Sequence, residues 1–176
     1  MKHIATLLLA ITVVAVTSCS KNGSSSGADA PASSATAEPS LPEAQVVDIV
    51  NAVNAQEAAK VATLLQANPK LVRAKFTSGG PVDGWPLLMI AAKQGDKPMV
   101  ELLLRSGADV NDKNNSSEVA LHYAALYGRK QIVQLLLDHK ADVNVKNDAE
   151  ATPLGAASSA GKADIVTLLK QHGAKE

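Results

Sequence analysis

The chain has few of the residues that covalent or catalytic chemistry needs. Cysteine occurs once, at Cys19, which excludes an intramolecular disulfide framework. The sequence combines histidine, cysteine and carboxylate in no metal-ligand pattern, so we expect neither a metal nor a cofactor. Gly79-Gly80 lacks the following Lys-Ser or Lys-Thr of a phosphate-binding loop. These absences argue against an enzyme.

Excess charge and aromatic residues are also scarce. The 17 basic residues are balanced by 17 acidic ones, and no basic stripe runs through the sequence. The aromatic residues are one Trp, two Tyr and one Phe. Nucleic-acid surfaces concentrate positive charge. We therefore expect no nucleic-acid partner.

The N-terminus has a short apolar run, from Ile4 to Val16, after Lys2 and His3. A membrane-spanning helix needs about 20 apolar residues, so this run is typical of a signal peptide. It ends Val16-Thr17-Ser18-Cys19, which resembles a bacterial lipobox. The resemblance implies that residues 1–18 are removed and that Cys19 is acylated. The alternative is an ordinary signal peptide with an incidental cysteine.

Lipid on Cys19 predicts a location for the chain. Two or more lipid signals give stable membrane attachment. Ser20, where an Asp resembles an inner-membrane retention mark, favours the outer membrane facing the periplasm. Residues 19–42 are rich in Ser, Ala, Gly and Pro, a composition that predicts a disordered linker.

The rest of the chain repeats itself every 33 residues. Gly95, Gly128 and Gly161 keep this interval, as do the apolar positions Val100, Val133, Val166, Leu103, Leu136 and Leu169. A fixed period of this size is typical of stacked supersecondary units, each too small to bury its own apolar face. It predicts an all-α repeat solenoid.

The repeated motifs resemble the ankyrin repeat. One copy reads Leu121-His122-Tyr123-Ala124-Ala125, then Gly128, then Ile132–Leu137, then Ala141-Asp142-Val143-Asn144. The resemblance implies about four helix-turn-helix units with hairpin fingers in one domain, 43–176. Their predicted bounds are 43–80, 81–113, 114–146 and 147–176. It also implies that His122 and Thr152 hydrogen-bond between neighbouring loops.

Ankyrin arrays vary on their finger tips and on the exposed side of each first helix, which together line a concave face. The predicted partner-binding residues at these positions are Trp85, Lys93, Lys113, Asn115, Glu118, Leu126, Tyr127 and Lys146. Trp and Tyr are favoured at binding hot spots. The alternative is that Trp85 packs on the 76–82 loop and Tyr127 covers a neighbouring helix. We expect Tyr123 in the core.

The sequence therefore predicts a monomeric, lipid-anchored bacterial envelope protein that binds another protein. Periplasmic ankyrin proteins include some that support oxidative-stress defence and others that act as immunity proteins against secreted toxins. Resemblance does not choose between these roles. An enzyme and a purely structural tether are the alternatives from other classes.

Overall fold

The computed structural model describes residues 41–76 and 84–175, which belong to one compact unit. The predicted signal peptide, the lipidation site Cys19 and most of the predicted linker lie outside the described residues, as does the loop with Gly79 and Gly80. The elements follow in the order α1 (Glu43–Asn54), α2 (Ala58–Ala67), a 3₁₀ helix η1 (Pro69–Arg73), β1 (Lys75–Phe76), β2 (Trp85–Pro86), α3 (Leu87–Gln94), α4 (Lys97–Arg105), α5 (Ala120–Leu126), α6 (Lys130–Asp138), α7 (Pro153–Ser159) and α8 (Ala163–Gln171).

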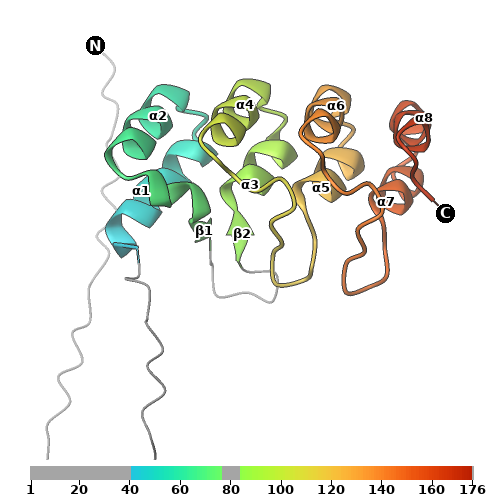
Figure 1. The fold of residues 1–176 in the computed structure, drawn as a ribbon, viewed down its shortest axis with the longest axis horizontal. Helices are drawn as coiled ribbons and strands as arrows, with labels where there is room; N and C mark the ends of the chain where they lie inside the picture. The colour runs from blue at the N-terminus through green and yellow to red at the C-terminus, as the bar shows by residue number, and fades with distance from the viewer. Residues whose placement is uncertain (1–40, 77–83, 176) are drawn as a thin grey trace, which may run out of the picture. The chain divides into compact units, whose positions relative to one another are not determined.

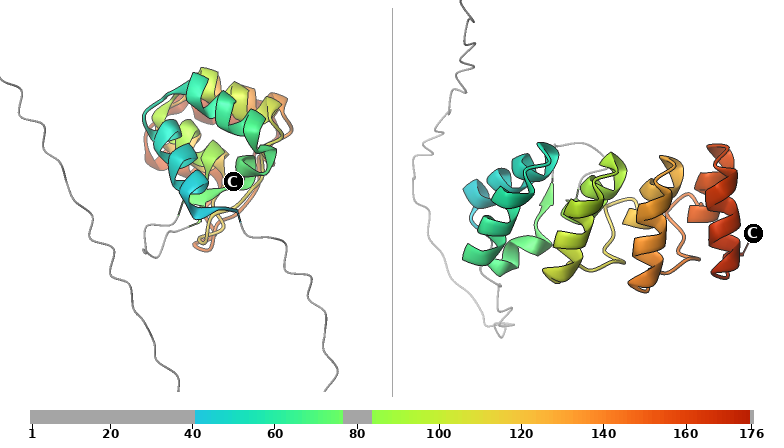
Figure 2. Two further views of the ribbon diagram at one scale, coloured as in Figure 1. Left: turned by 90° about the vertical axis from the view of Figure 1, so that its left-hand side faces the viewer. Right: turned by 90° about the horizontal axis from the view of Figure 1, so that it is seen from above.

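The helices form four antiparallel pairs arranged in two layers. The first helices, α1, α3, α5 and α7, lie in one layer with the fingers extending below them (Figure 1). The second helices, α2, α4, α6 and α8, lie side by side above them (Figure 2). Strands β1 and β2 pair antiparallel, with Phe76 opposite Trp85. The described residues thus form the all-α repeat solenoid that the 33-residue period predicts.

The core is continuous and almost entirely aliphatic. Met99, Val100 and Leu103 of α4 are fully buried, and the same spacing recurs on α6, where Val133 and Leu136 are fully buried. Each helix pair presents such a face to the next one. Burying it in the stack is what stabilises units that are too small to fold alone.

The first helix pair shows one departure from the sequence pattern. The apolar spacing predicts a helix that starts at Gln56, whereas α2 begins at Ala58. Gln56 has a φ of 59°, which is the left-handed region and cannot continue a right-handed helix. Gln56 therefore belongs to the turn between α1 and α2 and not to the second helix.

His122 joins two repeats through both ring nitrogens. The Val119 amide donates to Nδ1 (3.2 Å), and Nε2 faces the Ala151 carbonyl oxygen (3.1 Å) in the next finger. Nε2 must therefore carry the proton in the neutral ring. Thr152 was expected to bond across loops as well, but its hydroxyl accepts from the Gly155 amide (3.1 Å) at the start of its own helix. It caps α7 and does not link repeats.

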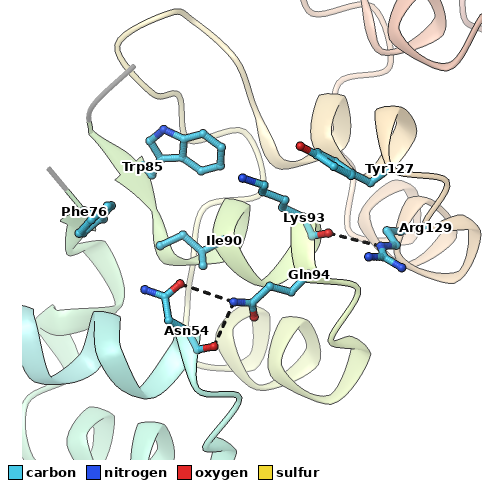
Figure 3. A pocket seen from close by; sticks show the side chains of 8 residues that line it. All are labelled: Asn54, Phe76, Trp85, Ile90, Lys93, Gln94, Tyr127 and Arg129. Atoms are coloured by element: carbon cyan, nitrogen blue, oxygen red, sulfur yellow. Dashed lines mark hydrogen bonds between the residues drawn. The ribbon is translucent and has the colours of Figure 1, made fainter. Parts of the chain in front are cut away.

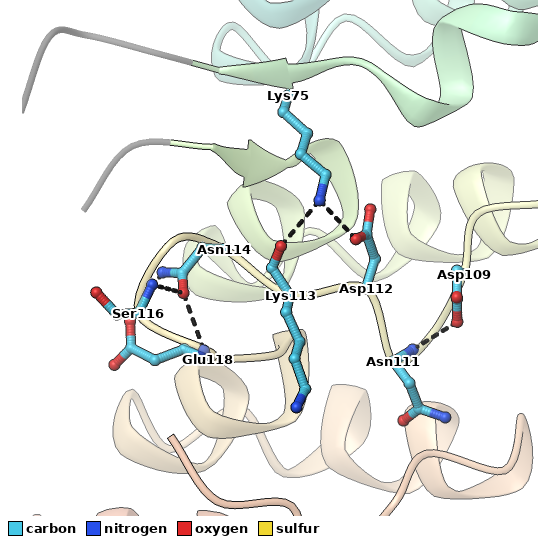
Figure 4. A network of polar contacts seen from close by, with 8 residues as sticks. All are labelled: Lys75, Asp109, Asn111, Asp112, Lys113, Asn114, Ser116 and Glu118. Atoms are coloured by element: carbon cyan, nitrogen blue, oxygen red, sulfur yellow. Dashed lines mark hydrogen bonds and ion pairs between the residues drawn. The ribbon is translucent and has the colours of Figure 1, made fainter. Parts of the chain in front are cut away.

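Asparagine side chains fix the backbone within each finger, and a lysine side chain joins two neighbouring fingers. Buried Asn114 accepts from the amides of Ser116 (3.0 Å) and Glu118 (2.9 Å), as Figure 4 shows. Asn147, 33 residues later, accepts in the same way from the amides of Ala149 and Ala151. The side chain of Lys75 crosses to the second finger and donates to Asp112 Oδ1 (2.7 Å) and to the Lys113 carbonyl (2.9 Å). Neighbouring fingers are therefore fixed relative to one another.

The burial of His122 predicts acid sensitivity. Desolvation is the main cause that lowers the pKa of His122 below its usual 6.5. As the pH falls below about 6.5, the unfolded chain therefore binds a proton that the folded chain resists. The free energy of unfolding should be insensitive to this group above pH 7 and decrease towards pH 5, by at most about 1.4 kcal/mol per pH unit.

Urea titrations across this pH range provide the measurement. His122→Asn should flatten the pH dependence of the free energy of unfolding relative to the wild type. Equal slopes for the wild type and His122→Asn would contradict this account of the buried ring.

Candidate functional site

A groove of about 520 Å³ lies beside helix α3 on the finger side of the first helices. It extends from the end of α1 to the residues that follow α5 (Figure 3). Its lining residues come from three successive repeats and are Asn54, Phe76, Trp85, Ile90, Lys93, Gln94, Tyr127 and Arg129. Stacking of the repeats is therefore what assembles this groove.

Three aromatic rings follow one another along this face and form what we call the aromatic ladder: Trp85, Tyr123 and Tyr127. The rings of Trp85 and Tyr123 are tilted by 48°, and those of Tyr123 and Tyr127 are stacked. The ring centroids of Trp85 and Tyr123 are 4.5 Å apart, and those of Tyr123 and Tyr127 are 6.4 Å apart. Pairs at these separations add about 0.5–1.5 kcal/mol beyond the burial of their area. The ladder therefore holds Trp85 and Tyr127 in fixed places at the groove.

The ammonium group of Lys93 lies over the ladder. Its Nζ is 5.1 Å from the ring centroid of Trp85 and 5.8 Å from that of Tyr127 (Figure 3). Both distances are within the range of cation–π attraction. The exposed side chain is therefore held between the two rings, and its charge lies at the mouth of the groove.

A second cation, Arg129, reaches the same groove from the next repeat. Its Nε donates to the Lys93 carbonyl (3.3 Å). The side chain passes over Gly95, where an added Cβ would lie 2.8 Å from Nε. Gly95 has a φ of +89°, so the backbone here favours glycine, and a side chain at this position would displace the flexible end of Arg129.

Gln94 leaves one polar atom unsatisfied at the groove. Its Nε2 donates to the Asn54 carbonyl (3.3 Å), which links α3 to α1. Its Oε1 is buried and has no hydrogen-bond partner among the described residues. A buried acceptor without a donor costs about 1–3 kcal/mol.

Tyr123 was expected in the core, and this prediction is wrong. The side chain is only half-buried, because its ring fills the space between Trp85 and Tyr127 and its hydroxyl reaches Glu118. The hydroxyl donates to Glu118 Oε2 (2.5 Å), which also accepts from Asn114 Nδ2 (2.9 Å). Burial, followed by the bond to Glu118, raises the pKa of the Tyr123 hydroxyl well above its usual 10. Tyr123 therefore stays a neutral donor.

Of the eight predicted partner-binding residues, the structure brings three together at the groove: Trp85, Lys93 and Tyr127. Lys113 and Leu126 are exposed on the same repeats but do not line it. The remaining three are engaged locally. Asn115 packs against Gly84, Glu118 holds Tyr123, and Lys146 pairs with Glu150 (2.6 Å).

Other groove residues were not among those predicted. Ile90 stands one repeat before Tyr123, so the 33-residue period could have placed both on this face. Arg129 precedes the second helix of its repeat, α6, and lies outside the finger and first-helix positions from which the binding residues were predicted. Phe76 comes from the irregular first repeat, and no periodic signal identifies it.

Among residues 41–76 and 84–175, no group of three or more His, Cys, Asp or Glu side chains could hold a metal ion. In the same part of the chain, no helix is long and apolar enough to cross a membrane. The groove can bind through apolar contact, charge and hydrogen bonds.

Comparison with known proteins agrees with the architecture. The family model described as ankyrin repeats (3 copies) matches residues 49–147 and 88–176. A comparison with curated proteins gives no match. Ankyrin repeats indicate a role in protein–protein interaction, and the family is typically a non-catalytic scaffold. The match covers more than half of the sequence and agrees with the paired helices and fingers described above, so the chain belongs to the ankyrin-repeat family.

Proposed function

We propose that this chain is a lipid-anchored protein of the bacterial envelope that binds another protein through the groove beside α3. The groove binds by shape and charge, and the protein is a scaffold without catalytic activity. The lipid on Cys19 fixes the location of the domain and raises its effective concentration near envelope partners.

One observation carries the binding part of this proposal: the aromatic side chains of the chain gather at one place. The sequence has one Trp, two Tyr and one Phe. Phe76, Trp85 and Tyr127 line the groove, and the ring of Tyr123 contacts those of Trp85 and Tyr127. The buried core, by contrast, is aliphatic. Aromatic residues that are absent from the core and concentrated on one partly exposed face are typical of a binding hot spot.

Removal of an exposed ring tests this part. Tyr127 has 44% of its surface exposed, so Tyr127→Ala should leave the helical circular dichroism signal intact. The variant should bind the partner, first isolated by crosslinking to the full chain, with about thirtyfold lower affinity, equivalent to about 2 kcal/mol. Trp85→Ala should act in the same direction, with some loss of stability because Trp85 also packs on the core.

Val47→Ala and His139→Ala are the matched controls for that titration. Val47 is an apolar side chain with 56% of its surface exposed, and neither residue lines the groove. Both variants should bind normally at the same salt concentration. Normal binding by the two aromatic variants, with loss of binding in either control, would place the interaction elsewhere.

The anchor has its own test, because it rests on the sequence Val16-Thr17-Ser18-Cys19 alone. Metabolic labelling with a fatty acid should mark the wild type. Cys19→Ser should abolish the label and leave an unprocessed precursor, since the acceptor for the lipid is the sulfur. Ser18→Ala, which keeps a small residue before the cysteine, should still be labelled. A labelled Cys19→Ser protein would refute the anchor.

The biological setting follows from the identity of the partner. A catalase or peroxidase would assign the chain to stress defence, which we take as the first hypothesis. A secreted toxin would identify an immunity protein, which is the alternative.

A further inference from the structure

We infer that the groove selects a particular chemistry in its partner: a segment in which an acidic side chain accompanies a large apolar one. This inference rests on the proposed function, because it takes the groove to be the binding surface. It adds the charge and the composition of what enters it.

Among the described residues that line it, the groove carries positive charge and no compensating acid. Its eight lining residues include the two cations Lys93 and Arg129 and no carboxylate. Neither cation has an ion-pair partner among the described residues. Two cations on the fingers are paired within the chain, Lys75 with Asp112 (2.7 Å) and Lys146 with Glu150 (2.6 Å), whereas the exposed Lys113 is in no ion pair with a described residue. The positive charge at the groove is thus left for a ligand.

Glu118, the acid beside the aromatic ladder, does not change this balance. Its Oε2 accepts from the Tyr123 hydroxyl and from Asn114 Nδ2, so it is committed to holding the ladder. A cationic segment would therefore meet two like charges in the groove without a carboxylate there to bind it. Like-charge contacts of this kind select against the wrong partner.

The positions of the two cations suit a carboxylate. Arg129 Nε donates to the Lys93 carbonyl, so the guanidinium is held beside the backbone of the residue whose ammonium lies over Trp85 and Tyr127. The aromatic faces orient the Lys93 ammonium without neutralising it, and its N–H groups stay available as donors. Charge-assisted hydrogen bonds to a carboxylate are about twice as strong as neutral ones.

Apart from the amides of Asn54 and Gln94, the remaining side chains of the lining are apolar or aromatic, and they account for the large apolar residue of the recognised segment. Phe76, Trp85 and Ile90 lie along the part of the groove away from Arg129 (Figure 3). A volume of about 520 Å³ accommodates a few side chains. The occupant that fits is therefore a short protein segment with an aromatic or large aliphatic residue close to an Asp or Glu.

A library of random ten-residue peptides displayed on phage, selected against the immobilised full chain, tests this inference. The enriched peptides should carry Asp or Glu within two or three residues of Trp, Phe, Leu or Ile. The double variant Lys93→Glu with Arg129→Glu should bind these peptides about tenfold or more weakly. When the double variant is the immobilised target of the selection, the enriched peptides should carry Lys or Arg in place of the acid.

The matched control is Lys70→Glu with Arg73→Glu. These are also one lysine and one arginine, both are exposed in η1, and neither lines the groove. The control has the same net charge as the groove variant and should bind the acidic peptides as the wild type does. No enrichment, enrichment of basic or uncharged peptides, or equal losses in the two double variants would overturn the inference.

The result also separates this inference from the proposed function. If Tyr127→Ala weakens the native partner while Lys93→Glu with Arg129→Glu does not, the groove is the binding surface and the acidic specificity is wrong. If neither change affects the native partner, the proposed function itself fails.

Discussion

The structure depends on the packing of each helix pair against its neighbour. No single pair buries its own apolar face, so residues such as Leu103 and Leu136 are fully buried only because the next repeat is present. The same packing sets the positions of residues far apart in the sequence. Phe76, Lys93 and Arg129 belong to three different repeats and share one groove only because the stack is in register.

Hydrogen bonds between repeats fix the relative positions of units that apolar packing brings together. Asn111 Oδ1 accepts from the Asp142 amide (2.9 Å), and Asn144 Oδ1 accepts from the Lys175 amide (2.8 Å). Both asparagines follow an aspartate whose side chain accepts from the asparagine amide, so each of these turns is first fixed locally and then joined to the next. His122 does the same between fingers. Aliphatic packing alone would allow repeats to slide, whereas these bonds fix their spacing.

The groove departs from the rules that the rest of the domain follows. It has aromatic rings where the core is aliphatic, cations without ion-pair partners among the described residues, and the unpaired amide oxygen of Gln94. The unpaired oxygen of Gln94 lowers the stability of the isolated protein, and the two cations gain no ion pair among the described residues, whereas the contacts between the aromatic rings add stability. Departures of this kind are expected at functional sites, where binding and not folding determines the residue.

The sequence predicts the repeats well because their period is local information, repeated in each copy. It also predicts that Trp85, Lys93 and Tyr127 share one face, because they occupy variable positions in a fixed frame, and the structure brings these three side chains together. It does not predict how the side chains meet. Tyr123 is in the ladder and not in the core because the rings of Trp85 and Tyr127 lie on either side of it. Arg129 reaches the groove because Gly95, in another repeat, leaves room for it.

The central claim is that this chain works through the groove beside α3. Photo-crosslinking in intact cells tests it most directly, with benzoylphenylalanine placed at Leu126 or, as the control, at Gln131. Both positions are exposed, but Leu126 occupies the repeat position of Lys93 on the finger side, whereas Gln131 lies on the second helix α6. The account predicts a discrete crosslinked protein from Leu126 and none from Gln131. A crosslink from Gln131 with none from Leu126 would contradict it.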